Sequence, residues 1–190
     1  MGRLSLDPEA TQQLLTKYQN EHSLIAEGAA LNHGISPLDF NSHVDDALPL
    51  EELLAPDPEL YKMLQEMDRS KVKLWLLTNA YVNHSKRVIR ILGIEDQFEG
   101  LTYCDYGVTP MLCKPSFEMF RKAMKEAGVN DVEACYFVDD SAENCRQAEK
   151  LGWTTVHLVE ETAQPPAEYV CGHKVARLIE LRELFPQFFI

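Results

Sequence analysis

Short apolar runs separated by longer helical patterns fill the chain from residue 72 onward. The runs have the length of buried strands and occur at residues 72–77, 101–104, 134–138 and 154–158, the second being the weakest. Between and after them, apolar positions spaced by three or four residues predict helices over residues 81–92, 115–128, 142–151 and 175–184. Strands that alternate with helices of this length predict βαβ units wound around a parallel sheet.

The first third of the chain carries helix signals only. Asp7-Pro8, Ser36-Pro37 and Asp57-Pro58 each place a capping residue directly before a proline at the first helical position. We therefore predict two parts, a helical cap over residues 1–69 and an α/β core over residues 70–190. The predicted class is α/β, a Rossmann-like core with a parallel sheet and an N-terminal helical cap.

Polar side chains follow two of the predicted strands. Thr78-Asn79 ends the run at residues 72–77, and Asp139-Asp140 ends the run at residues 134–138. Functional groups in open parallel sheets collect at the carboxyl ends of the strands. These four residues are therefore expected to lie along one edge of the sheet, under the helical cap.

The two adjacent aspartates suggest a metal site. Neighbouring carboxylates repel one another, so a cation or several hydrogen-bond donors must compensate for Asp139 and Asp140. Magnesium prefers hard oxygen ligands of this kind and often bridges to a phosphate. The alternative is that both residues form a turn and cap the next helix, where aspartate is favoured in any case.

Two further motifs suggest phosphate binding. The Thr78 hydroxyl and nearby backbone N–H groups at a helix entrance could hold a phosphoryl oxygen, although a simple helix cap would use the same residue. Lys114 precedes Pro115 at a predicted helix start, where a cation opposes the helix dipole. A bound phosphate or a paired carboxylate would offset that cost, and a solvated lysine is the alternative.

Charge and cysteine content narrow the classes of partner. The net charge of −12 and the pI near 4.9 oppose binding to nucleic-acid polymers and anionic membranes, but not to a small phosphate ester. No apolar stretch approaches the roughly 20 residues of a membrane span. The five cysteines lack metal-ligand spacing, which indicates reduced thiols in the cytoplasm or the nucleus.

The order of these motifs resembles the haloacid dehalogenase superfamily, whose members are mostly phosphohydrolases. The resemblance is closer to its pyrimidine 5′-nucleotidase-like branch, best known from fungi, and covers about residues 7–185. The stretches that carry it are His43-Val44-Asp45-Asp46-Ala47-Leu48-Pro49-Leu50, Leu77-Thr78-Asn79-Ala80, Leu101-Thr102-Tyr103-Cys104-Asp105-Tyr106, Cys113-Lys114-Pro115-Ser116 and Tyr136-Phe137-Val138-Asp139-Asp140-Ser141.

The resemblance implies a role for each matching residue. Thr78 would bind the transferring phosphoryl group with Asn79 beside it, and Lys114 would stabilise the phosphoryl charge. Asp139 would be a magnesium ligand, and Asp140 would support the ion or Lys114. The implied activity is magnesium-dependent hydrolysis of a small phosphorylated metabolite such as a nucleoside monophosphate.

One part of the family pattern is absent. The family's first strand ends in Asp-x-Asp, which supplies the nucleophile and the general acid–base, and no such segment precedes Thr78. We therefore expect impaired turnover and weak magnesium binding. The alternative, from another class, is a non-catalytic, truncated relative that binds a ligand or a partner protein.

The missing strand has a structural consequence as well. In the family it lies between the strands that correspond to residues 72–77 and 134–138, so its absence leaves two inner edges. Each buried group without a hydrogen bond costs about 1–3 kcal/mol. We expect the two strands either to pair directly, the slightly favoured outcome, or to be completed by another chain in a homodimer.

Overall fold

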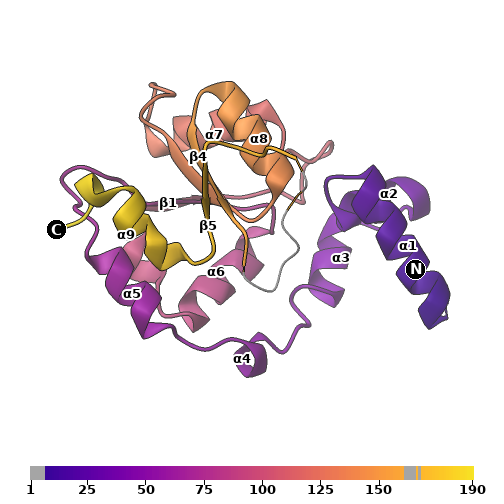
Figure 1. The fold of residues 1–190 in the computed structure, drawn as a ribbon. Coiled ribbons are helices and arrows are strands. Elements are labelled where there is room, and N and C mark those ends of the chain that lie inside the picture. The colour runs from indigo at the N-terminus through magenta and orange to yellow at the C-terminus, as the bar shows by residue number, and fades with distance from the viewer. Residues whose placement is uncertain (1–6, 161–165, 167) are drawn as a thin grey trace. The chain divides into compact units, whose positions relative to one another are not determined.

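The computed structural model describes residues 7–160, 166 and 168–190 (Figure 1). Contacts divide the chain into two compact units, Met1–Leu48 with Asp105–Met111 and Pro49–Cys104 with Leu112–Ile190. Among the described residues, no helix is long and apolar enough to cross a membrane. The five cysteines all lie in this part of the chain and carry free thiols.

The described residues of the first unit form the helices α1 (Pro8–Glu21), α2 (Ile25–His33) and α3 (Pro37–His43). The predicted starts of α1 and α3 are confirmed. Asp7 accepts the N–H of Ala10 at 2.8 Å, and Ser36 accepts the N–H of Asp39 at 3.4 Å. Helix α2, which was not predicted, ends at Gly34 in the left-handed conformation that glycine adopts most readily.

The second unit begins with two short helices, α4 (Leu50–Leu53) and α5 (Pro58–Gln65). Asp57 caps α5 by accepting the N–H groups of Glu59 and Leu60 at 2.9 and 3.1 Å, as the Asp-Pro signal predicted. Since α4 and α5 pack with the strand-containing unit, the helical signals of the first third extend into both units. The boundary proposed at residue 69 stays a prediction.

The strands form two parallel sheets. In one, β1 (Trp75–Leu77) pairs with β2 (Gly100–Thr102), and in the other β3 (Tyr136–Asp139), β4 (Thr154–Leu158) and β5 (His173–Val175) lie in that order. Helices α6 (Val82–Ile91), α7 (Phe117–Ala127) and α8 (Ala142–Leu151) connect successive strands. The predicted parallel βαβ arrangement is therefore confirmed.

The last predicted helix is partly wrong. Residues 173–175 form β5 rather than the start of a helix, and only α9 (Leu181–Leu184) and a preceding 3-10 turn are helical. The open edge of β4 explains the difference. Pairing with β4 satisfies the backbone of residues 173–175 and buries Val175, which outweighs a weak local preference for helix.

The predicted direct pairing of the strands that end at Thr78 and Asp139 is wrong. Strand β1 pairs only with β2, and β3 pairs only with β4, within the residues that the structure describes. A cavity lined by Trp75 and Leu77 of β1 and by Tyr136 and Phe137 of β3 separates the two strands. Lys114 reaches both carboxyl ends, and apolar side chains from α7 line the space between the strands.

Apolar clusters cover both faces of the strands. Helices α7 and α8 lie on one side, and α5 and α6 lie on the other (Figure 1). On the first side, Phe120 stacks edge-to-face on Phe137 and Trp153, with ring centroids 5.5 and 5.3 Å away. On the second side, Leu74 packs against Met63 and its neighbours. Packing on both faces explains the continuous apolar run at residues 72–77, which contributes Leu77 to the first cluster and Leu74 to the second.

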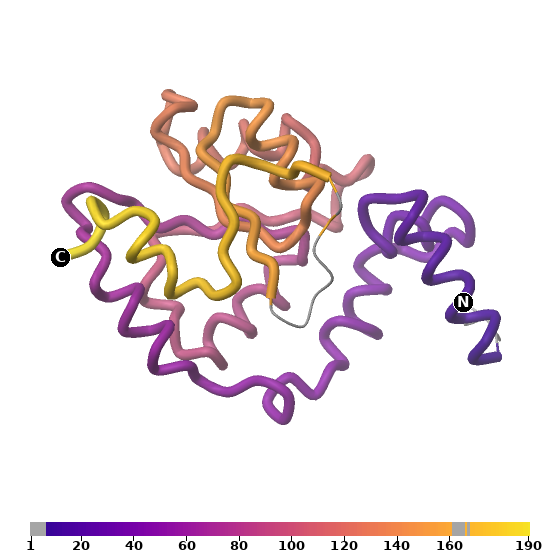
Figure 2. Tube along the Cα trace, viewed as in Figure 1, coloured from indigo at the N-terminus to yellow at the C-terminus, as the bar shows by residue number. Residues whose placement is uncertain are grey.

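The C-terminal segment runs beside the residues that precede β1, as Figure 2 shows. The N–H of Asp68 donates to the carbonyl of Phe188 at 2.8 Å, and the N–H of Ile190 donates to the carbonyl of Glu66 at 2.9 Å. These two bonds hold the end of the chain to the loop between α5 and β1. They join segments that lie more than a hundred residues apart.

Candidate functional site

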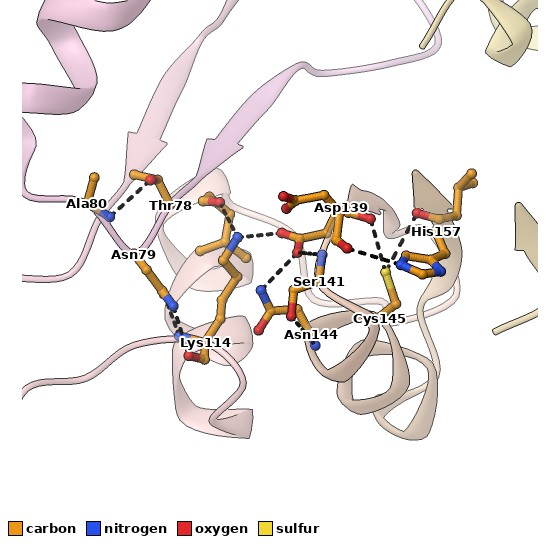
Figure 3. A network of polar contacts seen from close by, with 12 residues as sticks. Thr78, Asn79, Ala80, Lys114, Asp139, Ser141, Asn144, Cys145 and His157 are labelled. Carbon is orange, nitrogen blue, oxygen red and sulfur yellow. Dashed lines mark hydrogen bonds and ion pairs between the residues drawn. The ribbon is translucent and has the colours of Figure 1, made fainter. Parts of the chain in front are cut away.

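Lys114 lies between the carboxyl ends of the two sheets (Figure 3). Its Nζ donates to the carbonyl of Leu77, the last residue of β1, at 3.0 Å, and pairs with Asp139 Oδ2, at the end of β3, at 2.6 Å. The lysine and aspartate side chains are each only 8% exposed. The ammonium also lies 5.4 Å from the centre of the Phe137 ring. The site is therefore built around a buried, paired cation.

Asn79 fixes the backbone of Lys114. Its Nδ2 donates to the Lys114 carbonyl at 2.9 Å, and its Oδ1 accepts the Lys114 N–H at 2.7 Å. A side-chain amide thus satisfies both backbone groups of one residue, as a neighbouring strand would. This contact ties the loop before α7 to the end of β1 and determines where the ammonium lies.

Both oxygens of Asp139 accept hydrogen bonds. While Oδ2 faces Lys114, Oδ1 accepts the backbone N–H of Ser141 at 2.9 Å and Nδ2 of Asn144 at 2.8 Å. The two donors come from the first turn of α8, whose N-cap is Ser141. The negative charge of Asp139 is therefore balanced by the Lys114 cation and by the N-terminus of α8. A buried carboxylate needs partners of this kind.

Asp140 lies next to this pair and is exposed. Its backbone carbonyl lies 3.0 Å from Nε2 of His157, a buried residue of β4. Cys145 of α8 donates to the carbonyl of Asp139 at 3.4 Å, and burial raises the pKa of its thiol. A neutral thiol of this kind supports the turn and is not a nucleophile.

Thr78 stabilises the turn after β1. Its Oγ1 accepts the N–H of Ala80 at 3.1 Å, and its own N–H donates to the carbonyl of Thr102 at 3.0 Å. Helix α6 begins only at Val82, with Tyr81 as its N-cap, so Thr78 is not the helix cap that the alternative interpretation assumed. A hydroxyl that accepts one bond still has its own proton to donate.

Carboxylate oxygens are ligands that magnesium prefers, but this site offers too few of them. No group of three or more His, Cys, Asp or Glu side chains that could hold a metal occurs in the described part of the chain. Both oxygens of Asp139 already accept bonds from protein donors. Magnesium bound here would need most of its oxygens from water or from a ligand.

The structure thus brings together Thr78, Asn79, Lys114 and Asp139, with Asp140 adjacent. Sequence reasoning missed Asn144 and His157, which position the two aspartates. Asn144 could have been found, since it falls in the first turn of the helix that follows Asp139-Asp140. Nothing in the local sequence pointed to His157, because it reaches Asp140 only through the pairing of β3 with β4.

The strands are parallel and are connected by helices, which defines an α/β protein. The polar groups lie at the carboxyl ends of the strands, which is where such proteins have their functional site. Comparison with known proteins gives the family. A model described as haloacid dehalogenase-like hydrolase matches residues 6–152, and the chain belongs to this family. The resemblance found in the sequence is confirmed at this level.

Two relatives carry names that refer to phosphate. The chain is 35% identical over 167 residues to Phosphate metabolism protein 8 of Saccharomyces cerevisiae, covering 83% of this chain and 52% of the yeast protein. It is 30% identical over 110 residues to Glyceraldehyde 3-phosphate phosphatase of Methanocaldococcus jannaschii, covering 57% of this chain and 46% of that protein. The chain thus spans about half the length of the curated relatives it matches.

Solved structures share the fold. A HAD phosphatase from Thermococcus onnurineus superposes with a TM-score of 0.68 at 18% identity, covering 96% of this chain and 82% of that one. The L-2-haloacid dehalogenase of Xanthobacter autotrophicus gives a TM-score of 0.65 at 16% identity, covering 95% and 87%. Both support the α/β fold with parallel sheets.

Replacing Asn79 by alanine should lower the free energy of unfolding by about 1–3 kcal/mol, because two backbone groups of Lys114 would lose their partners. Urea unfolding followed by tryptophan fluorescence measures the change. Asn83→Ala, at an exposed position of α6, is the matched control and should change the stability by no more than about 0.5 kcal/mol. Equal losses in both variants would show that the amide contact contributes nothing.

Proposed function

We propose that Thr78, Asn79 and Lys114 bind the phosphoryl group of a small phosphorylated metabolite, with Asp139 and Asp140 on the magnesium side of the site. One observation carries this proposal. The Lys114 ammonium is buried and fixed at the carboxyl ends of β1 and β3, within 3.0 Å of Leu77 O and 2.6 Å of Asp139 Oδ2. A positioned cation beside a helix N-terminus suits a phosphate.

The proposed ligand is a nucleoside 5′-monophosphate, as in the pyrimidine 5′-nucleotidase-like branch. The stretches around Thr78, Lys114 and Asp139 support that branch. The names of two relatives, one a phosphatase of a phosphorylated triose and one a phosphate metabolism protein, support a phosphate ester in general. The free thiols suit a reducing compartment, and we propose the cytoplasm or the nucleus as the place of action.

Turnover by this chain alone is proposed to be impaired. No strand bearing a carboxylate lies between β1 and β3 in the described residues. A positioned nucleophile accounts for many orders of magnitude in rate, and binding groups alone leave little of it. The proposed behaviour is therefore ligand binding with little hydrolysis, and magnesium affinity that is weak without the ligand.

The proposal is tested by measuring binding and hydrolysis separately. Uridine 5′-monophosphate, adenosine 5′-monophosphate and glyceraldehyde 3-phosphate are titrated by calorimetry with and without magnesium, and phosphate release is followed in the same samples. We expect saturable binding of the uridine nucleotide, at least about fivefold weaker without magnesium.

A conservative variant identifies the site. Thr78→Val keeps the side-chain volume but removes the hydroxyl, and it should weaken nucleotide binding about ten- to a hundredfold, the value of one hydrogen bond to a charged group. Thr154→Val, at the opposite, amino end of β4, should bind like the unmodified chain. Binding unaffected by Thr78→Val would refute the site, and rapid phosphate release would refute the impaired turnover.

A further inference from the structure

Two cysteines of the second unit lie beside each other in the fold. Cys145 belongs to α8, and Cys171 lies two residues before β5, so that β4 separates them along the chain. Their thiols are free and interact directly. Cys145 is fully buried, whereas Cys171 is half-buried and within reach of solvent. The fold therefore pairs one shielded thiol with one accessible thiol.

Neighbouring strands hold the two thiols at the same level of the sheet. Sγ of Cys145 donates to the carbonyl of Val156 at 3.7 Å, and Sγ of Cys171 donates to the carbonyl of His173 at 3.3 Å. Val156 and His173 are partners in the parallel pairing of β4 with β5. Because each thiol is anchored to one of these partners, the pairing of the strands keeps the two sulfurs close together.

Helix α8 also fixes the backbone on both sides of Cys171. Before it, the carbonyl of Tyr169 accepts Nε of Arg146 at 3.3 Å, and the Tyr169 hydroxyl donates to Glu149 Oε1 at 3.1 Å. After it, the N–H of Gly172 donates to the same carboxylate oxygen at 2.7 Å. These three bonds hold the segment against the helix that carries the other thiol.

We propose that Cys145 and Cys171 form a reversible oxidation site, which a peroxide converts into a disulfide. A disulfide needs its sulfurs about 2.0 Å apart, and rotation of two side chains that already interact brings them together. The proposal goes beyond the proposed function, because it involves neither phosphate nor magnesium. The Cys145 thiol also donates to the carbonyl of Asp139 at 3.4 Å, so the oxidation site adjoins the candidate phosphate site (Figure 3).

The proposed chemistry consumes one hydrogen peroxide for each pair of thiols. The deprotonated Cys171 sulfur attacks one peroxide oxygen, the O–O bond breaks, and the leaving hydroxide takes up a proton as water, which leaves a sulfenic acid on Cys171. Cys145 stays a neutral thiol until this sulfenic acid forms beside it. The S–S bond then forms as the S–O bond breaks, and the hydroxyl leaves with the Cys145 proton as a second water. The two thiols thus supply the two electrons that reduce the peroxide.

Peptide mapping tests the pair directly. The full chain is treated with a small molar excess of hydrogen peroxide, alkylated during acid denaturation to prevent thiol exchange, and digested without reductant for mass spectrometry. We expect the peptide that carries Cys145 to be linked to the peptide that carries Cys171, and the intact mass to fall by two hydrogen atoms. A dithiol reductant added before alkylation should restore all five free thiols.

Two single variants assign the reaction to this pair. Cys171→Ser removes the accessible sulfur, so it should yield no linked peptide and leave Cys145 as a free thiol. Cys135→Ser is the matched control, because Cys135 is also half-buried but its thiol donates to the carbonyl of Asp131. This variant should form the same link at the rate of the unmodified chain. If Cys171→Ser fails to fold, the map of the unmodified chain decides alone.

Three results would overturn the proposal. The first is a free Cys145 together with a sulfinic or sulfonic acid at Cys171, which would mean that further oxidation outruns the condensation. The second is a link that joins either residue to another cysteine of the chain or to a second chain. The third is the recovery of all five free thiols under conditions that fully oxidise a small free dithiol in the same solution.

Discussion

Replacing Lys114 by methionine should lower the free energy of unfolding by about 3–5 kcal/mol. The change leaves the Asp139 carboxylate buried without its cation, and losing one partner of a buried ion pair costs about that much. The Leu77 carbonyl loses its donor at the same time. Chemical unfolding followed by circular dichroism measures the loss, and phosphate-ester binding should be abolished in any folded protein.

Two further variants assign this loss to the ion pair. Lys86→Met, at an exposed position of α6, should change the stability by no more than about 0.5 kcal/mol. Combining Lys114→Met with Asp139→Asn removes both charges, so the double variant should be more stable than the sum of the two single losses predicts. Strict additivity would mean that the 2.6 Å contact carries no coupling energy.

Replacing Phe120 by alanine should cost about 3–5 kcal/mol, the usual range for a buried aromatic residue. Phe120 is fully buried and stacks on Phe137 of β3 and on Trp153. Calorimetric melting measures the loss. Phe117→Ala, on the exposed side of the same helix, is the control and should cost less than about 1 kcal/mol. Similar losses in both would mean that this cluster does not hold β3 in place.

Much of the fold could be predicted because its signals are local. Asp-Pro and Ser-Pro pairs marked α1, α3 and α5, and the glycines at 128 and 152 ended α7 and α8 in left-handed turns. The polar residues at the strand ends then predicted where the site lies, because parallel strands bring their carboxyl ends together. Helix α7 begins at Phe117, two residues after Pro115, because Ser116 is the capping residue.

The parts of the fold and site that the sequence did not predict depend on contacts between distant segments. Strand β5 exists only because β4 has an open edge, and His157 reaches Asp140 only across the β3–β4 pair. The contacts of the Lys114 side chain were not predictable either, because they join the ends of two separate strands. No local sequence pattern predicts that the long, flexible side chain of Lys114 contacts the ends of two strands.

The division into two sheets also affects how the second unit moves. A continuous sheet transmits displacement stiffly through its ladder of backbone bonds, but no ladder crosses from β1 to β3 in the described residues. The two halves are joined across this line by side-chain packing and by the bridge from Lys114. We therefore expect local opening to occur along this line. Each half would open as a separate cooperative block before the unit unfolds as a whole.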